Sequence, residues 1–289
     1  GKAVTAADVV SSINFHRGEN STSAAGPLVA NVTDITTEGD DIVVFTLDGG
    51  NADFPFFLSD YHLVICKAEG DSIDWKSGDG CGSYVLKDFK PGVSFAVERN
   101  PNHWRSDVAW FDSAEILAIV DQNARTTALV SGDVDVVDRL DLKTGGPLAR
   151  NPIGQGQRYF NTELAQKTYD PDKAKFHLKQ AGLDSLDVKL SAADAAFGGA
   201  VDAAVLYQSS AAGAGINLTP VREANDGYWS DAWMKKPFCA VYWSGRPVED
   251  QMFATAYKCG AAWNDSFWCN DRFDELMLKA RSELDEAKR

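Results

Sequence analysis

The residues of this sequence that could do chemistry are few and mostly isolated. The four histidines are His16, His62, His103 and His177. None is paired with a second histidine at the helical spacing that a metal site needs. No pattern for a nucleophilic serine, a zinc protease or a phosphate-binding loop occurs. The sequence therefore predicts neither a metal site nor a cofactor.

Paired carboxylates are the remaining catalytic candidates. Asp40-Asp41 and Glu249-Asp250 could carry out the acid–base steps of a hydrolase. In a chain with 42 acidic residues, however, such pairs are expected by chance. A hydrolase thus stays an alternative interpretation, and a binding protein is favoured.

The most informative group of residues is aromatic. Five of the eight tryptophans fall between Trp229 and Trp268. An apolar segment within this region ends in a turn with a cation, and these residues are the predicted ligand contacts: Tyr242, Trp243, Ser244, Gly245 and Arg246. Ligands of α/β proteins bind beyond the carboxyl ends of strands, where such turns project. We expect Trp243 to stack on a ligand and Arg246 to bind a carboxylate or phosphate.

The alternative is that the aromatic side chains form a core and that Arg246 pairs with Glu249 or Asp250. For Trp229, Trp233 and Phe253 we favour the core. For Trp243 and Arg246 we favour a binding cleft. On that interpretation, Arg246→Ala abolishes ligand binding and barely changes the melting temperature.

Composition narrows the class of protein. The chain has 289 residues, and 28 basic against 42 acidic residues give a formal net charge of −14. Nucleic acids and anionic membranes attract basic surfaces, so we expect no nucleic-acid partner. No run approaches the roughly 18 apolar residues of a membrane helix. The start Gly1-Lys2-Ala3-Val4 does not resemble a signal peptide, as in a secreted protein whose signal peptide has been removed.

The five cysteines bear on the compartment. Cys66 and Cys81 flank one short polar segment, and Cys259 and Cys269 flank another. Either pair could close a local disulfide, although buried free thiols are the alternative. The fifth cysteine, Cys239, belongs to neither pair and lies in an apolar stretch.

The predicted elements alternate between helix and strand. Thr5 and Asp8 are spaced as a capping box that opens a helix, and Asp170, Pro171 and Gly182 delimit a second helix. Further helices are predicted over 123–131, 199–214, 228–234 and 271–289. Strands are predicted over 32–36, 42–47, 83–89, 94–99, 114–120 (buried), 134–137, 186–190, 216–221 and 239–243.

The segment 142–157 is rich in glycine and proline and divides the chain. We therefore predict a first lobe over 1–141, a junction over 142–152 and a second, α/β lobe over 153–289.

Several motifs together resemble the family-five extracellular solute-binding proteins of ABC importers, which capture peptides, opines, nickel chelates and oligosaccharides. The matching segments are Thr5 to Val10, Gly80 to Tyr84, Arg99 to Trp104, Ala128 to Asp135 and Tyr169 to Gly182. The resemblance implies a two-lobed α/β periplasmic-binding-protein fold of the large, peptide-binding type. Where peptide-binding relatives carry an aspartate for the α-amino group, this sequence has Arg246, which favours an anionic ligand.

Two departures from the family pattern are visible. A helical segment usual in the family after Asn151-Pro152 is absent, and the chain starts and stops inside the usual domain. We expect a partial chain with part of the sheet missing and edges exposed.

The resemblance implies a function: the chain captures a small solute between two lobes and delivers it to an ABC permease in the inner membrane. It further implies a monomer without a cofactor, in the periplasm or, in a Gram-positive organism, outside the cell at the membrane. Besides the hydrolase, a chaperone-like extracellular module is an alternative. That module predicts an exposed apolar patch and no deep pocket.

Overall fold

The computed structural model describes residues 2–70, 72–138, 158–165 and 167–289. The chain folds into two compact units. Unit 1 comprises Gly1–Ala118 and Gly245–Arg289, and unit 2 comprises Ile119–Ser244. The predicted junction 142–152 lies outside the described residues.

Unit 1 begins with helix α1 (Ala6–Asn14), and its start confirms the predicted capping box. The Asp8 carboxylate accepts hydrogen bonds from the backbone N–H of Thr5 at 2.8 Å and of Ala68 at 2.8 Å. These two bonds lower the pKa of Asp8. One side chain thus caps the helix and ties it to strand β3 (Lys67–Glu69).

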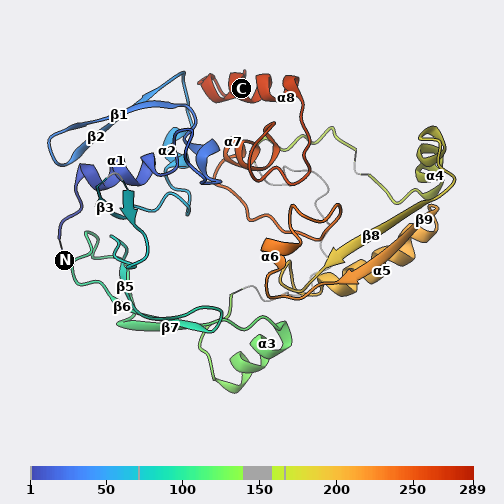
Figure 1. Cartoon of the computed structure of the whole chain (residues 1–289), viewed down its shortest axis with the longest axis horizontal. Helices are drawn as coiled ribbons and strands as arrows, with labels where there is room; N and C mark the ends of the chain where they lie inside the picture. Colours follow the sequence, from blue (N-terminus) through green and yellow to red (C-terminus); the bar gives the residue numbers. More distant parts are fainter. Residues whose placement is uncertain (1, 71, 139–157, 166) are drawn as a thin grey trace. The chain divides into compact units, whose positions relative to one another are not determined.

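Three antiparallel sheets belong to unit 1. β1 (Val32–Glu38) pairs with β2 (Ile42–Leu47), and β3 pairs with β4 (Ser72–Asp74). β5 (Tyr84–Lys90), β6 (Ser94–Arg99) and β7 (Ser113–Leu117) form the third sheet in that order. Both predicted hairpins are confirmed, as Figure 1 shows.

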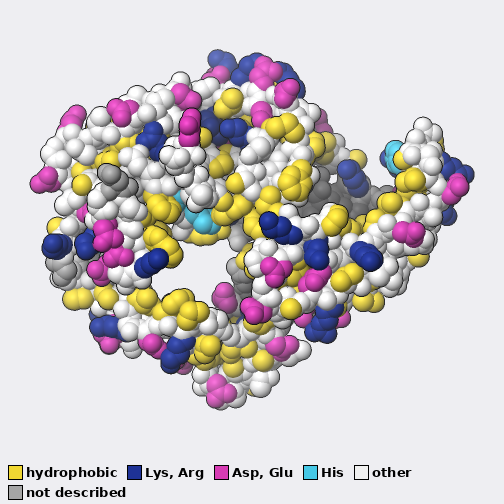
Figure 2. Space-filling model, viewed as in Figure 1, with side chains coloured by type: hydrophobic (Ala, Val, Ile, Leu, Met, Phe, Trp, Pro, Cys, Tyr) yellow, Lys and Arg dark blue, Asp and Glu magenta, His cyan; other side chains and the backbone are white. Residues whose placement is uncertain are grey.

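The third sheet keeps much apolar surface exposed. The strand predicted over 114–120 is confirmed as β7, but its predicted burial is wrong, because β7 is an edge strand and Ile116 and Leu117 are exposed. Figure 2 shows hydrophobic side chains at the surface over β5–β7, and the exposed ones are Val85, Leu86, Phe89, Phe95, Ile116 and Leu117.

The remaining elements of unit 1 come from both ends of the sequence. They are η1 (Gly26–Leu28), α2 (Phe54–Phe57), α7 (Glu249–Met252), the π-helical turn η2 (Phe253–Tyr257) and α8 (Asp271–Ser282). The core packs Ile13, Val29 and Phe57 from the first segment against Ala254 from the second. The helix predicted over 271–289 ends earlier, at Ser282.

This grouping differs from the predicted lobe over 153–289, since residues 245–289 pack with the N-terminal segment. Buried polar contacts explain why. Arg281 binds Asp250 with its Nε at 2.8 Å, and its backbone carbonyl accepts a hydrogen bond from Ala52 at 3.0 Å. Arg289 pairs with Asp53, which is buried on α2's N-terminal side.

Unit 2 is built on two parallel strands. β8 (Leu186–Ala192) pairs in register with β9 (Ile216–Arg222), and α5 (Ala200–Ala212) connects them and packs along β9 (Figure 1). The core contains Leu190, Leu218 and a row of alanines on α5 that lets the helix approach the sheet closely. This confirms the predicted α/β pattern.

Three further helices belong to unit 2: α3 (Gln122–Ser131), α4 (Pro171–Gln180) and α6 (Tyr228–Asp231). α3 ends at Gly132 in the left-handed conformation, and α4 begins at the predicted Asp170 cap. Two predicted strands are wrong. Residues 134–137 form no strand, and the segment 239–243 makes only an isolated bridge between Cys239 and Ser191.

Candidate ligand-binding site

The predicted contacts Tyr242 to Arg246 cross the boundary between the two units. Tyr242, Trp243 and Ser244 belong to unit 2, whereas Gly245 and Arg246 belong to unit 1. The five predicted contacts are therefore held by two different units.

In unit 2 the aromatic side chains contact one another edge to face. The Trp229 ring lies 5.4 Å from Tyr242 and 5.9 Å from Trp233, and Trp233 lies 6.4 Å from Trp243. Tyr242 is exposed and Trp243 is half-buried, so this cluster is not a closed core. The apolar face that it keeps at the surface can stack on a ligand.

Tyr228 anchors this cluster from beneath. Its buried hydroxyl donates to the backbone oxygens of Ser191 at 3.1 Å and Ala240 at 2.8 Å, which fixes the segment before Trp243 on strand β8. Burial raises the pKa of Tyr228 to about 12, so the hydroxyl stays protonated.

In unit 1, Arg246 forms a buried ion pair with Asp60. The Arg246 Nε atom lies 3.5 Å from Asp60 Oδ2, and only 4% of the arginine side chain is exposed. Its guanidinium carbon lies 5.3 Å from the centroid of the Tyr61 ring, a cation–π contact. The predicted alternative partner Asp250 is instead paired with Arg281.

Asp60 is the centre of a hydrogen-bonded cluster. Its carboxylate, 1% exposed, accepts from Gln251 Nε2 at 2.7 Å and from His62 through the backbone N–H at 3.0 Å and Nδ1 at 2.6 Å. A carboxylate only accepts hydrogen bonds, so His62 Nδ1 carries the proton. The cluster holds the His62 ring and Arg246 in fixed orientations.

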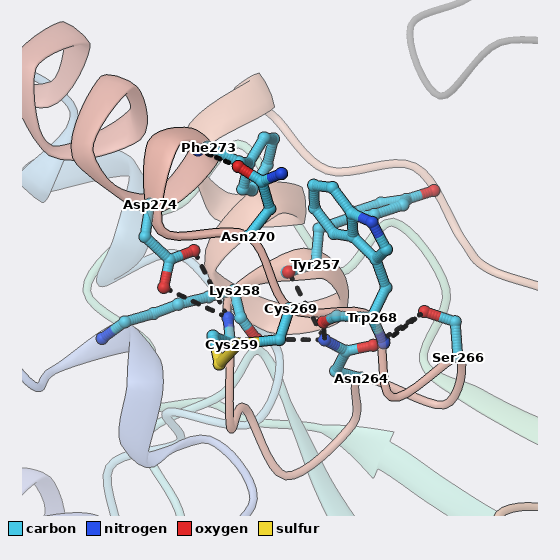
Figure 3. The surroundings of a disulfide bond; sticks show 10 residues. All are labelled: Tyr257, Lys258, Cys259, Asn264, Ser266, Trp268, Cys269, Asn270, Phe273 and Asp274. Atoms are coloured by element: carbon cyan, nitrogen blue, oxygen red, sulfur yellow. Dashed lines mark hydrogen bonds between the residues drawn. A yellow bond between two sulfur atoms is a disulfide. The ribbon is translucent and has the colours of Figure 1, made fainter.

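Trp263 reaches the same place from a loop closed by a disulfide. Cys259 and Cys269 are bonded, which confirms one predicted pair. Figure 3 shows the loop: the side-chain amide of buried Asn264 donates to the backbone oxygens of Lys258 at 3.2 Å and Trp268 at 2.6 Å. Held in this way, Trp263 lies 4.6 Å from His62, edge to face.

The other predicted pair, Cys66 and Cys81, forms no disulfide, and both are free thiols in the structure. Ser12 fixes the backbone of Cys66 by hydrogen bonds at 2.9 and 3.2 Å, and the isolated bridge pairs Cys66 with Gly80 rather than with Cys81. Burial raises the pKa of the Cys66 thiol, which keeps it unreactive.

The sequence reasoning missed Asp60, Tyr61 and Trp263 and treated His62 as isolated. A usable signal was the run Asp60-Tyr61-His62, in which a carboxylate stands two residues before a histidine. Within the described ranges, no group of three or more histidine, cysteine, aspartate or glutamate side chains could hold a metal ion. Nor does the described part of the chain contain a helix long and apolar enough to cross a membrane.

The comparison with known families decides the identity. The model of the family "Bacterial extracellular solute-binding proteins, family 5 Middle" matches residues 1–152, about half of the chain. This chain belongs to family 5 of the bacterial extracellular solute-binding proteins.

One relative matches part of the chain in sequence. The dipeptide-binding protein of Escherichia coli (strain K12) is 28% identical over 185 residues. That match covers 58% of this chain but only 33% of the relative, so the aligned region is a third of its length.

Solved structures match nearly the whole chain. The binding protein AgaA of A. tumefaciens R10, in complex with agropinic acid, has a TM-score of 0.84 at 18% identity and covers 100% of this chain and 72% of its own. The Helicobacter pylori protein DppA, in complex with the peptide STSA, has a TM-score of 0.79 at 18% identity and covers 99% and 72%. These matches establish the periplasmic-binding-protein fold, present as a part of the longer chains.

Proposed function

We propose that this family 5 protein is the substrate-binding component of an ABC importer. It captures a small, anionic organic solute, peptide-like or opine-like, and delivers it to a membrane permease. The observation that carries the proposal is the family match over residues 1–152. The fold shared with AgaA and DppA, each solved with a small ligand, supports it.

The ligand contacts that we propose are Tyr242, Trp243 and Ser244 from unit 2 and Gly245 and Arg246 from unit 1. Trp243 lies in a partly exposed aromatic cluster, which suits stacking. Arg246 is oriented by Asp60 and Tyr61, so little side-chain entropy is lost when its guanidinium binds a carboxylate.

Catalysis is not part of this proposal. Of the carboxylate pairs, Asp40 and Asp41 are exposed in the β1–β2 turn, and Asp250 is buried and paired with Arg281. Neither arrangement resembles two carboxylates facing a substrate. We further propose a monomer without a nucleic-acid partner, in the periplasm or outside the cell.

Titration of the purified protein tests the proposal. Tryptophan fluorescence and calorimetry would be followed with three probes: agropinic acid, the dipeptide Ala-Ala and the nickel–histidine complex Ni(L-His)2. We expect saturable binding of at least one probe, with the probe recovered chemically unchanged. Absence of binding to all three, or release of a hydrolysis product, would contradict the proposal.

A further inference from the structure

We propose that Tyr61, His62 and Trp263 form a ligand-contact surface on unit 1, in which His62 Nε2 accepts a hydrogen bond from an N–H or O–H group of the solute. We call these three residues the His62 surface. The inference rests on the proposed function and adds contacts that lie outside the segment Tyr242 to Arg246.

The protonation of His62 is the first argument. Buried Asp60 accepts a hydrogen bond from His62 Nδ1–H at 2.6 Å, which fixes the tautomer whose other ring nitrogen, Nε2, is the acceptor of an imidazole. The His62 side chain is 25% exposed, whereas Asp60 is 1% exposed. Asp60 covers the Nδ1 edge of the ring, and Nε2 lies on the other edge.

The rings beside His62 supply the second argument. The Tyr61 ring contacts His62 with centroids 3.9 Å apart and the ring planes tilted by 37°, yet the tyrosine is 64% exposed. A ring that served only core packing would be covered. Exposed aromatic faces next to an oriented polar group are what small-molecule sites use, because the rings contribute apolar area and the polar group selects the ligand.

The rigidity of the support is the third argument. Asp60 is held by Gln251, which is completely buried, and Trp263 is held by a loop that the Cys259–Cys269 disulfide closes. Two segments separated by 191 residues thus meet under one small surface. Binding sites need such fixed support, since a loosely held acceptor loses entropy on binding.

Histidine NMR of the full chain tests the His62 surface directly. The protein would be labelled with 15N-histidine and titrated with agropinic acid and Ala-Ala. We expect the His62 Nε2 resonance to shift with ligand, and the resonance of His177, which is exposed on α4 in unit 2, to stay in place.

Matched variants give a second readout. His62→Phe keeps the ring but removes the acceptor, and we expect it to weaken binding of the probe about tenfold, the effect of about 1.4 kcal/mol. His62→Gln keeps an acceptor oxygen and should bind within about threefold of wild type. Asp60→Asn should change the 15N shifts of His62 toward a mixture of tautomers, and His177→Phe should bind as wild type.

The outcomes separate this inference from the proposed function. If wild type binds a probe while the His62 resonance is unmoved and His62→Phe binds normally, the inference is wrong and the proposed function stands. If wild type binds neither of these probes nor Ni(L-His)2, the proposed function fails, and the His62 surface with it.

Discussion

At the scale of single residues, Arg246 shows how a binding side chain can also be structural. Its guanidinium was predicted to bind an anion in a cleft, and in the structure the side chain is almost fully covered and pairs with Asp60. Removing one partner of a buried pair leaves the other charge without compensation in a poorly solvating environment. The expectation of an unchanged melting temperature therefore does not fit the structure.

We predict that Arg246→Ala lowers the free energy of unfolding by about 3 kcal/mol, because Asp60 stays buried without its cation. Urea unfolding measures the loss, and calorimetry with the bound probe should show that binding is lost as well. Arg272→Ala is the control: its exposed pair with Glu275 should contribute less than about 1 kcal/mol. Equal stability of the two variants would contradict the buried pair.

His16 gives a pH dependence. It is buried, and its Nδ1 lies 2.6 Å from the Ser23 hydroxyl. Burial, and then the nearby His62, lower the pKa of His16, while Asp60 acts in the opposite direction. The folded state thus favours the neutral ring, so the stability that His16 contributes is present above the unfolded pKa of 6.5 and is lost as the pH falls through the lower, folded pKa.

We predict that the urea concentration at the unfolding midpoint of the wild type decreases when the pH is lowered from 7.5 to 5. In His16→Gln this decrease should be smaller. His177→Gln, changed at an exposed position of α4, should retain the wild-type dependence. The assignment to His16 fails if the fall is the same in both variants.

At the scale of elements, the loop from Cys259 to Cys269 has a shape that depends on a covalent bond. The disulfide spans 10 residues, and Asn264 satisfies the inward-facing carbonyl groups. Asp274 on α8 also accepts the backbone N–H of Cys259, with both its oxygens at 3.3 Å. The loop thus links η2 to α8 and presents Trp263.

Replacing both cysteines by serine should lower the free energy of unfolding by about 2–3 kcal/mol, the loop-closure entropy of a ring of this size. It should also weaken probe binding, since Trp263 loses its support. Thermal or urea unfolding of Cys259→Ser/Cys269→Ser measures the first effect. Cys81→Ser, at an exposed free thiol, should leave both quantities unchanged.

At the scale of the whole molecule, the chain contributes to unit 1 from both its ends. The C-terminal segment supplies Ala254 to the core and the buried Asp250–Arg281 pair. Burial raises the pKa of the Asp250 carboxyl, although Arg281 opposes this effect. A substitution that destabilises the C-terminal segment should therefore also destabilise the N-terminal elements of unit 1.

We predict that Arg281→Ala destabilises the chain by about 3–5 kcal/mol and speeds hydrogen exchange in α2 and α7 of unit 1. Exchange in β8 and β9 of unit 2 should stay close to that of the wild type. The control is Lys279→Ala on the exposed side of the same helix. Faster exchange in both units alike would show that they do not behave as separate bodies.

The local elements were predictable because the interactions that form them join neighbouring residues. The Thr5–Asp8 capping box spans three residues, the Asp170 cap bonds to Lys173, and the glycine turn between β1 and β2 sets their register. The predictions failed where burial, rather than local sequence, decides the structure. Residues 114–120 have the pattern of a covered strand, but the strand lies at the edge of its sheet. Residues 239–243 pair with a strand only at the bridge between Cys239 and Ser191.

The sequence by itself determined the family motifs, most helices and hairpins, the α/β pattern of unit 2 and the two cysteine pairs close enough in the chain to bond, since each depends on residues close in the chain. Which pair bonds was decided by the tertiary structure. Only the tertiary structure decided that Arg246 meets Asp60, that Gln251 and His62 share this carboxylate, and that residues 245–289 join unit 1. The physical reason is distance along the chain. Contacts such as Asp53 with Arg289, 236 residues apart, leave no periodicity or spacing in the sequence, because they arise only when separate segments bury their charges together.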